Sequence, residues 1–177
     1  MYRLALLLTL SACFITENSA EPRAAIAHLQ SENISGSMKF EETDNGVRVF
    51  GSIKGLAAGK YGFHIHELGD VSSCAAAGAH FNPESRNHGA PDNGERHVGD
   101  LGNIQFKEDG TADIDIVDTV ITLRGATNVI GRTLMLHEGE DDLGLGGDET
   151  SLTTGNAGGR VACGVIGVDA PLDAWLV

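Results

Sequence analysis

The stretch Gly62-Phe63-His64-Ile65-His66-Glu67 alternates apolar and imidazole side chains, as expected for a strand. Successive side chains of a strand point to opposite faces, so His64 and His66 share one face while Phe63 and Ile65 share the other. The apolar pair is expected to pack in a core. Two imidazoles side by side on a rigid strand are suited to bind a metal ion. An isolated His-x-His is more often a pair of surface histidines, so the rest of the chain decides the matter.

Short segments with alternating side chains recur along the chain, and no long helical period appears. Asp44-Asn45-Gly46 predicts a turn that joins segments 34–41 and 47–53 in a hairpin. Lys107-Glu108-Asp109-Gly110 predicts a second hairpin between 101–106 and 112–117. The other predicted strands are 24–30, 60–67, 133–138 and 161–168. This pattern predicts an all-β fold, an eight-stranded antiparallel barrel or sandwich.

Two segments, 68–99 and 139–159, are long, rich in small and polar residues, and without periodicity. Long loops inside a compact domain usually carry function. The first contains Cys74, His80, His88 and His97, and the second ends at Arg160. We therefore expect the loops to supply the chemistry.

The chain divides into three predicted parts. A basic start and the apolar run 4–15 predict a secretory signal peptide over 1–20, too short to span a bilayer and removed after Ala20. Leu10-Ser11-Ala12-Cys13 also resembles a bacterial lipoprotein box, which leaves a bacterial lipoprotein or periplasmic protein as the alternative to secretion. Residues 21–168 form the predicted barrel domain. The tail 169–177 contains Trp175 and is expected to dock on the barrel or on a partner subunit.

The formal net charge is −13, and it stays so after removal of 1–20 because only Arg3 and Glu17 are lost. Such an acidic protein is expected to avoid nucleic acid and anionic membrane surfaces. An anionic substrate would need a local positive site.

Two cysteines remain after removal of the signal peptide, Cys74 and Cys163. An even pair in an exported chain predicts a disulfide, with two free thiols as the other possibility. Asn33-Ile34-Ser35 is a glycosylation acceptor triplet, usable only in a eukaryotic host and common by chance.

Six of the seven histidines fall in the motif region; the seventh, His28, is assigned no function. Asp100 follows His97 by three positions, where the first long loop returns to a strand. Zinc accepts imidazole and carboxylate ligands, whereas copper favours several imidazoles. The set exceeds the needs of one metal and suits two metals that share a ligand. The six histidines are His64, His66, His80, His88, His97 and His137.

Four motifs together resemble the copper/zinc superoxide dismutases. They are Gly62-Phe63-His64-Ile65-His66-Glu67, His80-Phe81-Asn82-Pro83, Arg96-His97-Val98-Gly99-Asp100-Leu101-Gly102-Asn103 and Gly155-Asn156-Ala157-Gly158-Gly159-Arg160-Val161-Ala162-Cys163-Gly164. The resemblance covers about 24–168 and is closest to the secreted, eukaryotic-type enzymes. It implies a Greek-key barrel and the dismutation of superoxide to dioxygen and hydrogen peroxide.

The resemblance also implies a role for each matching residue. One copper cation per subunit would be bound by His64, His66, His80 and His137. One Zn²⁺ would be bound by His80, His88, His97 and Asp100, with His80 bridging the two metals and moving a proton. Asp141 would hydrogen-bond a ligand of each metal, and Arg160 would attract and orient the superoxide anion beside copper.

Two further expectations follow from the resemblance. A homodimer would use Leu68, Gly69, Ile130, Gly131 and Val165. The second long loop has Gly139, Leu145 and Thr153 where lysine is common in the family, and it contains no lysine, so electrostatic steering of superoxide is expected to be weak.

Other classes of protein fit the sequence less well. A non-catalytic metal-binding module commonly loses a copper ligand or the arginine, and a copper-only variant lacks the zinc ligands and the second loop. A blue-copper carrier needs a cysteine thiolate, and a zinc hydrolase needs only three histidines.

Overall fold

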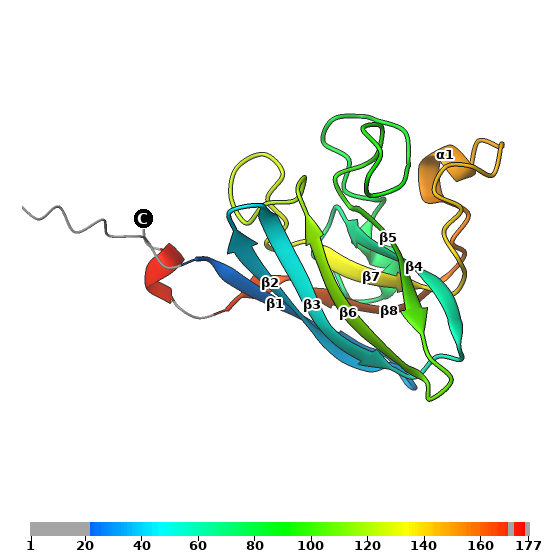
Figure 1. Cartoon of the computed structure of the whole chain (residues 1–177), viewed down its shortest axis with the longest axis horizontal. Helices are drawn as coiled ribbons and strands as arrows, with labels where there is room; N and C mark the ends of the chain where they lie inside the picture. The colour runs from blue at the N-terminus through cyan, green and yellow to red at the C-terminus, as the bar shows by residue number, and fades with distance from the viewer. Residues whose placement is uncertain (1–21, 170–171, 176–177) are drawn as a thin grey trace, which may run out of the picture.

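The computed structural model describes residues 22–169 and 172–175 (Figure 1). The predicted signal peptide, the lipoprotein-like box at Cys13 and the cleavage point after Ala20 lie outside the described residues. The main strands are β1 (Ala24–Gln30), β2 (Ser35–Thr43), β3 (Gly46–Lys54), β4 (Gly59–His66), β5 (Asp100–Phe106), β6 (Thr111–Asp118), β7 (Thr133–His137) and β8 (Arg160–Val165).

The predicted all-β architecture is confirmed. The strands follow the order β5-β4-β7-β8-β1-β2-β3-β6, and the strand pairs are antiparallel. The sheet curls until β5 and β6, its two ends, face each other across a seam, which makes a nearly closed barrel (Figure 1). A further short strand, β9 (Gly167–Val168), pairs with β1, so the predicted strand 161–168 is interrupted at Ile166.

The two predicted hairpins have different outcomes. β2 and β3 pair from Thr43–Gly46 to Ser35–Lys54, which confirms the first hairpin. The second is wrong, because β5 pairs with β4 and β6 pairs with β3. The turn 107–110 joins β5 to β6 across the seam instead. Alternation and turn residues identify strands and a reversal, but they do not specify which neighbour a strand chooses.

The barrel interior is filled by the apolar faces that the alternation predicts. Phe63 and Ile65 of β4 and Leu134 and Leu136 of β7 are fully buried in the core cluster. A third connection, 119–132, was not singled out from the sequence. It contributes three buried apolar side chains to the core cluster: Ile121, Leu123 and Val129.

The two predicted long loops are present and contain one short helical turn each. These are the 3₁₀ turn η1 (Cys74–Ala77) and α1 (Ser151–Thr154), so the loops are not wholly irregular. Both lie at the same side of the barrel (Figure 1). A disulfide between Cys74 and Cys163 ties η1 to β8, as predicted.

The tail turns back on the barrel through η2 (Leu172–Trp175), next to the start of β1 (Figure 1). The Trp175 ring packs against the core cluster, and its Nε1 donates a hydrogen bond to the Asp169 carbonyl at 3.2 Å. The Arg23 guanidinium lies 5.6 Å from the ring centroid. No helix within 22–169 or 172–175 has the length and apolar character needed to cross a membrane.

Candidate metal centre

Six histidines from three separate parts of the chain meet outside the barrel, beneath the two long loops. β4 and β7 are neighbouring strands, and they place His64, His66 and His137 on the outward face. The other three come from the first long loop, and two carboxylates join them from the start of β5 and from the second loop. All of these side chains are buried: His64, His66, His80, His88, His97, His137, Asp100 and Asp141.

The first set consists of His64, His66, His80 and His137, whose candidate ligand atoms all lie within 4.8 Å of one another. The Nδ1 atoms of His66 and His137 donate to the carbonyls of Gly78 (2.9 Å) and Gly158 (3.1 Å). Their Nε2 atoms are then unprotonated and face each other at 3.3 Å. Two lone pairs at this distance repel, so a cation between them is the arrangement that the geometry fits.

The second set consists of His80, His88, His97 and Asp100, again within 4.8 Å of one another. Asp100 Oδ1 lies 2.9 Å from His80 Nδ1 and 3.1 Å from His97 Nδ1. Its Oδ2 lies 3.0 Å from His88 Nδ1. Three imidazoles and one carboxylate form a donor set that zinc accepts.

Asp141 joins the two sets. Its Oδ2 accepts a hydrogen bond from His64 Nε2 and its Oδ1 accepts one from His88 Nε2, both at 2.8 Å. These bonds fix the tautomers, because they leave His64 Nδ1 for the first set and His88 Nδ1 for the second. Two buried nitrogens here have no hydrogen-bond partner, as expected of metal ligands: His64 Nδ1 and His80 Nε2.

The glycine at position 155 is required by this contact. Its φ is +62°, and a Cβ atom there would lie 2.0 Å from Asp141 Oδ1 and 2.4 Å from His88 Nε2. A side chain would therefore break the hydrogen bond between Asp141 and His88.

The protonation state of the histidines in the first set favours metal binding. Burial lowers the pKa of His64 to about 3, that of His66 to about 2 and that of His137 to about 4. These imidazoles are neutral at ordinary pH, which is the form that binds metals.

The second set differs because it contains a histidine with a raised pKa that contacts two ionised carboxylates. Burial opposes the charged form of His88, but its contacts with Asp100 and Asp141 outweigh burial and raise its pKa to about 9. Hydrogen bonds from histidines hold the pKa of Asp100 and of Asp141 well below the usual range, against the effect of burial. The carboxylates are thus ionised, and a cation among them offsets their cost of burial.

A cavity of about 710 Å³ opens onto the first set. Its wall contains His66, His80 and His137. Arg160 at the start of β8 also lines it, held by hydrogen bonds from Nη1 to the carbonyls of Cys74 (2.9 Å) and Ala75 (3.1 Å). The remaining wall from the second loop is uncharged: Thr150, Thr153, Thr154, Asn156 and Gly158.

Two contacts around the centre were not anticipated from the sequence. Arg96 Nη1 donates to the buried Asp118 at 2.6 Å, and Arg96 Nε donates to the His97 carbonyl at 3.0 Å. Asn103 on β5 makes two hydrogen bonds with the backbone of Asp141. The contacts of Arg96 with Asp118 and of Asn103 with Asp141 have no signal in sequence spacing, because each joins segments that only the fold brings together.

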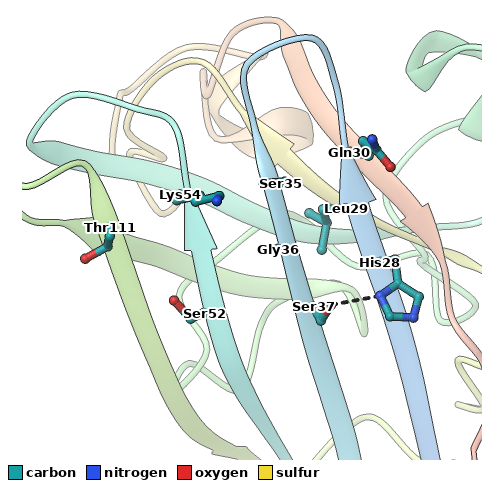
Figure 2. A pocket seen from close by; sticks show the side chains of 9 residues that line it. All are labelled: His28, Leu29, Gln30, Ser35, Gly36, Ser37, Ser52, Lys54 and Thr111. Atoms are coloured by element: carbon teal, nitrogen blue, oxygen red, sulfur yellow. Dashed lines mark hydrogen bonds between the residues drawn. The ribbon is translucent and has the colours of Figure 1, made fainter.

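A second hollow, of about 620 Å³, lies on the outer face of β1, β2, β3 and β6 (Figure 2). Its wall includes His28, whose Nδ1 lies 2.8 Å from Ser37 Oγ. It contains none of the six clustered histidines. Figure 2 shows three serines and a threonine there, together with Leu29, Gln30 and Lys54.

The comparisons with known proteins agree with the geometry. The family model described as copper/zinc superoxide dismutase (SODC) matches residues 34–166. Superoxide dismutase [Cu-Zn] A of Xenopus laevis is 53% identical over 139 residues, covering 77% of this chain and 91% of that protein. The extracellular superoxide dismutase [Cu-Zn] of Brugia pahangi is 49% identical over 150 residues, covering 82% of this chain and 75% of that protein.

A solved structure extends the likeness to the fold. The crystal structure of the clock protein EA4 is 52% identical in sequence and superposes with a TM-score of 0.81. The match covers 84% of this chain and 96% of that one.

Proposed function

The chain belongs to the copper/zinc superoxide dismutase family, and we propose that its two buried histidine sets hold the two metals of that family. Its reaction converts two superoxide anions and two protons into one dioxygen and one hydrogen peroxide. In this proposal the first set binds copper and the second binds zinc. The observation that carries the assignment is His80, which presents Nε2 to the first set and Nδ1 to the second.

Each set suits the metal assigned to it. Four imidazoles beside an open cavity fit copper, which supplies the one-electron acceptor and donor that the reaction needs. Three imidazoles and a carboxylate, of which only His80 lines that cavity, fit a structural zinc. Asp141 orients one ring of each set, and His80 links them.

Arg160 and His80 are the catalytic residues in this proposal. The Arg160 guanidinium lines the cavity and supplies the positive charge that attracts and orients a small anion. Burial lowers the pKa of Arg160, yet a guanidinium stays protonated in proteins. His80 Nε2 takes up one proton and returns it to the reduced product.

Purified protein tests this function directly. We expect copper and zinc on metal analysis, and rapid superoxide consumption that is lost in His64→Ala. The matched control is His28→Ala, which removes an exposed imidazole that contacts Ser37. Full activity without bound copper would overturn the proposal, as would equal losses in the two variants.

We further propose that the protein is secreted, with 1–20 as its signal peptide, 21–168 as the enzyme domain and 169–177 as an appended tail. The extracellular relative from Brugia pahangi supports this destination. The alternative is a bacterial lipoprotein or periplasmic enzyme with lipid on Cys13. Asn33 is exposed in the turn between β1 and β2, as a glycan acceptor requires. Intact mass of protein from culture medium decides between these: a start at Glu21, with or without glycan mass, supports secretion, whereas a lipidated Cys13 contradicts it.

A homodimer is the proposed assembly. Leu68 is 50% exposed and Val165 36% exposed, which leaves apolar surface for a second copy. The other proposed contact residues are Gly69, Ile130 and Gly131. Light scattering of the full chain and of a chain ending at Val168 tests both the assembly and the part played by the tail. A monomer at micromolar concentration in both cases would contradict the proposal.

A further inference from the structure

Asn103 holds the backbone of Asp141 with both ends of its side-chain amide. Its Nδ2 donates to the Asp141 carbonyl oxygen at 2.8 Å, and its Oδ1 accepts from the Asp141 N–H at 2.8 Å. Both polar groups of this loop residue are therefore paired with one side chain of strand β5. The contact attaches the second long loop to the barrel wall at Asp141.

Asp141 contacts a histidine of each metal set, so its position affects both sets. Each Asp141 carboxylate oxygen accepts from one histidine at 2.8 Å, His64 on one side and His88 on the other. A shift of the Asp141 backbone would move both acceptors together. It would then rotate two rings that present nitrogens to different metals.

The loop around Asp141 needs such an attachment. Leu143, two residues on, has φ of +61°, a conformation that costs energy for a residue with a side chain. Asp141 itself is a buried carboxylate, which is favourable only while its hydrogen bonds are kept. The Asn103 amide offers a donor and an acceptor at fixed spacing, which matches the carbonyl and N–H of one residue.

We propose that Asn103 is a positioning residue for both metal sets. It fixes the Asp141 backbone, so that the carboxylate turns His64 Nδ1 and His88 Nδ1 toward their metals. This inference rests on the ligand sets proposed above. Partners one step outside the ligands change metal affinity by about 10–100-fold, and Asn103 acts one step further out.

The surroundings of Asn103 make the inference testable. The side chain is half-buried and lines a hollow of about 660 Å³ at the seam, together with Glu140 and Leu143. A substituted side chain at position 103 would face this water-accessible hollow. We therefore expect substitution to perturb the metal centre more than the barrel.

The test is the release of zinc from the metal-loaded enzyme to a chelator. Asn103→Asp keeps the size and the acceptor but cannot donate to the Asp141 carbonyl, and it sets a negative charge against that oxygen. We expect about tenfold faster zinc release. We also expect a changed visible spectrum when Co²⁺ replaces zinc, because His88 is reoriented.

Gln105→Glu is the matched control. Gln105 lies on the same strand, and its Nε2 donates to the carbonyls of Gly59 (3.0 Å) and Phe106 (2.8 Å). The substitution makes the same chemical change away from Asp141, so zinc release and the Co²⁺ spectrum should match the wild type. Wild-type zinc release in Asn103→Asp would overturn the inference, as would equal acceleration in both variants. A wild-type protein that binds neither metal would instead refute the ligand sets.

Discussion

The two histidine sets share His80 but differ in what surrounds them. The first opens to a cavity of about 710 Å³ that also holds Arg160. Both sets are buried, but none of His88, His97 and Asp100 lies on the wall of this cavity. An open site lets a small anion reach a redox metal, whereas a closed site suits a structural metal. The contrast predicts that changes at the first set alter rate and changes at the second alter metal retention and stability.

Removing each metal in turn gives the largest effect. Removal of copper alone is expected to abolish superoxide consumption, because zinc has no second oxidation state to use. Removal of zinc alone is expected to leave turnover measurable but to lower the unfolding temperature. Calorimetry and a superoxide assay on each metal-depleted form check this. Equal activity losses in the two forms would remove the contrast between open and closed sets.

Arg160→Gln tests the open set without touching a proposed ligand. Loss of the charged contact with superoxide is expected to lower the rate by about 10–100-fold, the equivalent of about 1.5–3 kcal/mol for one hydrogen bond to a charged group. Copper and zinc contents should be unchanged. The control Arg124→Gln removes the same charge from an exposed pair with Glu42 and should leave the rate near that of the wild type.

Gly155→Ala tests the closed side through the contact with Asp141. The new methyl group would meet Asp141 Oδ1 and His88 Nε2, so zinc affinity is expected to fall by about tenfold. Gly147→Ala is the control in the same loop. Its φ is +82°, but a Cβ there meets nothing within 4 Å. It should cost only the backbone strain, about 1 kcal/mol. Equal zinc affinity in the two variants would show that the contact of Gly155 with Asp141 and His88 is not needed for zinc binding.

The smallest expected effect concerns the approach to the cavity. Because the second loop contributes only uncharged residues to the cavity wall, the wild-type rate is expected to vary by less than about twofold between low and physiological salt. Thr153→Lys should raise the rate at low salt by about two- to threefold and make it fall as salt is added. Leu152→Lys adds the same charge outside the cavity wall and should do less. A steep salt dependence in the wild type would contradict this prediction.

Much of the fold could be predicted because alternation and turn chemistry are local. Asp44-Asn45-Gly46 marks a turn in the sequence, and the chain reverses there between β2 and β3. The error at 107–110 has a physical cause. A polar turn between two strands favours a hairpin, but β5 and β6 form their backbone hydrogen bonds with β4 and β3 and lie at opposite ends of the strand order, so the turn crosses the seam.

In the candidate site, the proposed ligand residues could be predicted from the sequence, whereas the contacts that support them could not. Residues recognised by type and spacing, such as His64, His66 and His137, do converge in the structure. Their assignment to copper remains a prediction for metal analysis to test. Arg96 and Asn103 lie within a recognised motif, but the sequence did not indicate their roles, because these depend on Asp118 and Asp141, which are distant in the chain.

The sequence by itself determined the strand faces, the reversal at Asp44-Asn45-Gly46, the two long loops, and the kinds of ligand available to a metal. These follow from side-chain type and from the two-residue period of a strand. The tertiary structure decided which strands pair, which nitrogen of each histidine faces a metal, and which set is open to solvent. The choice of nitrogen depends on hydrogen bonds that the Gly78 and Gly158 carbonyls and the Asp141 carboxylate accept from histidines, and on the Asn103 amide that holds Asp141. These bonds span 12 to 77 positions of sequence. Such contacts join segments that are distant in sequence and adjacent only in the fold.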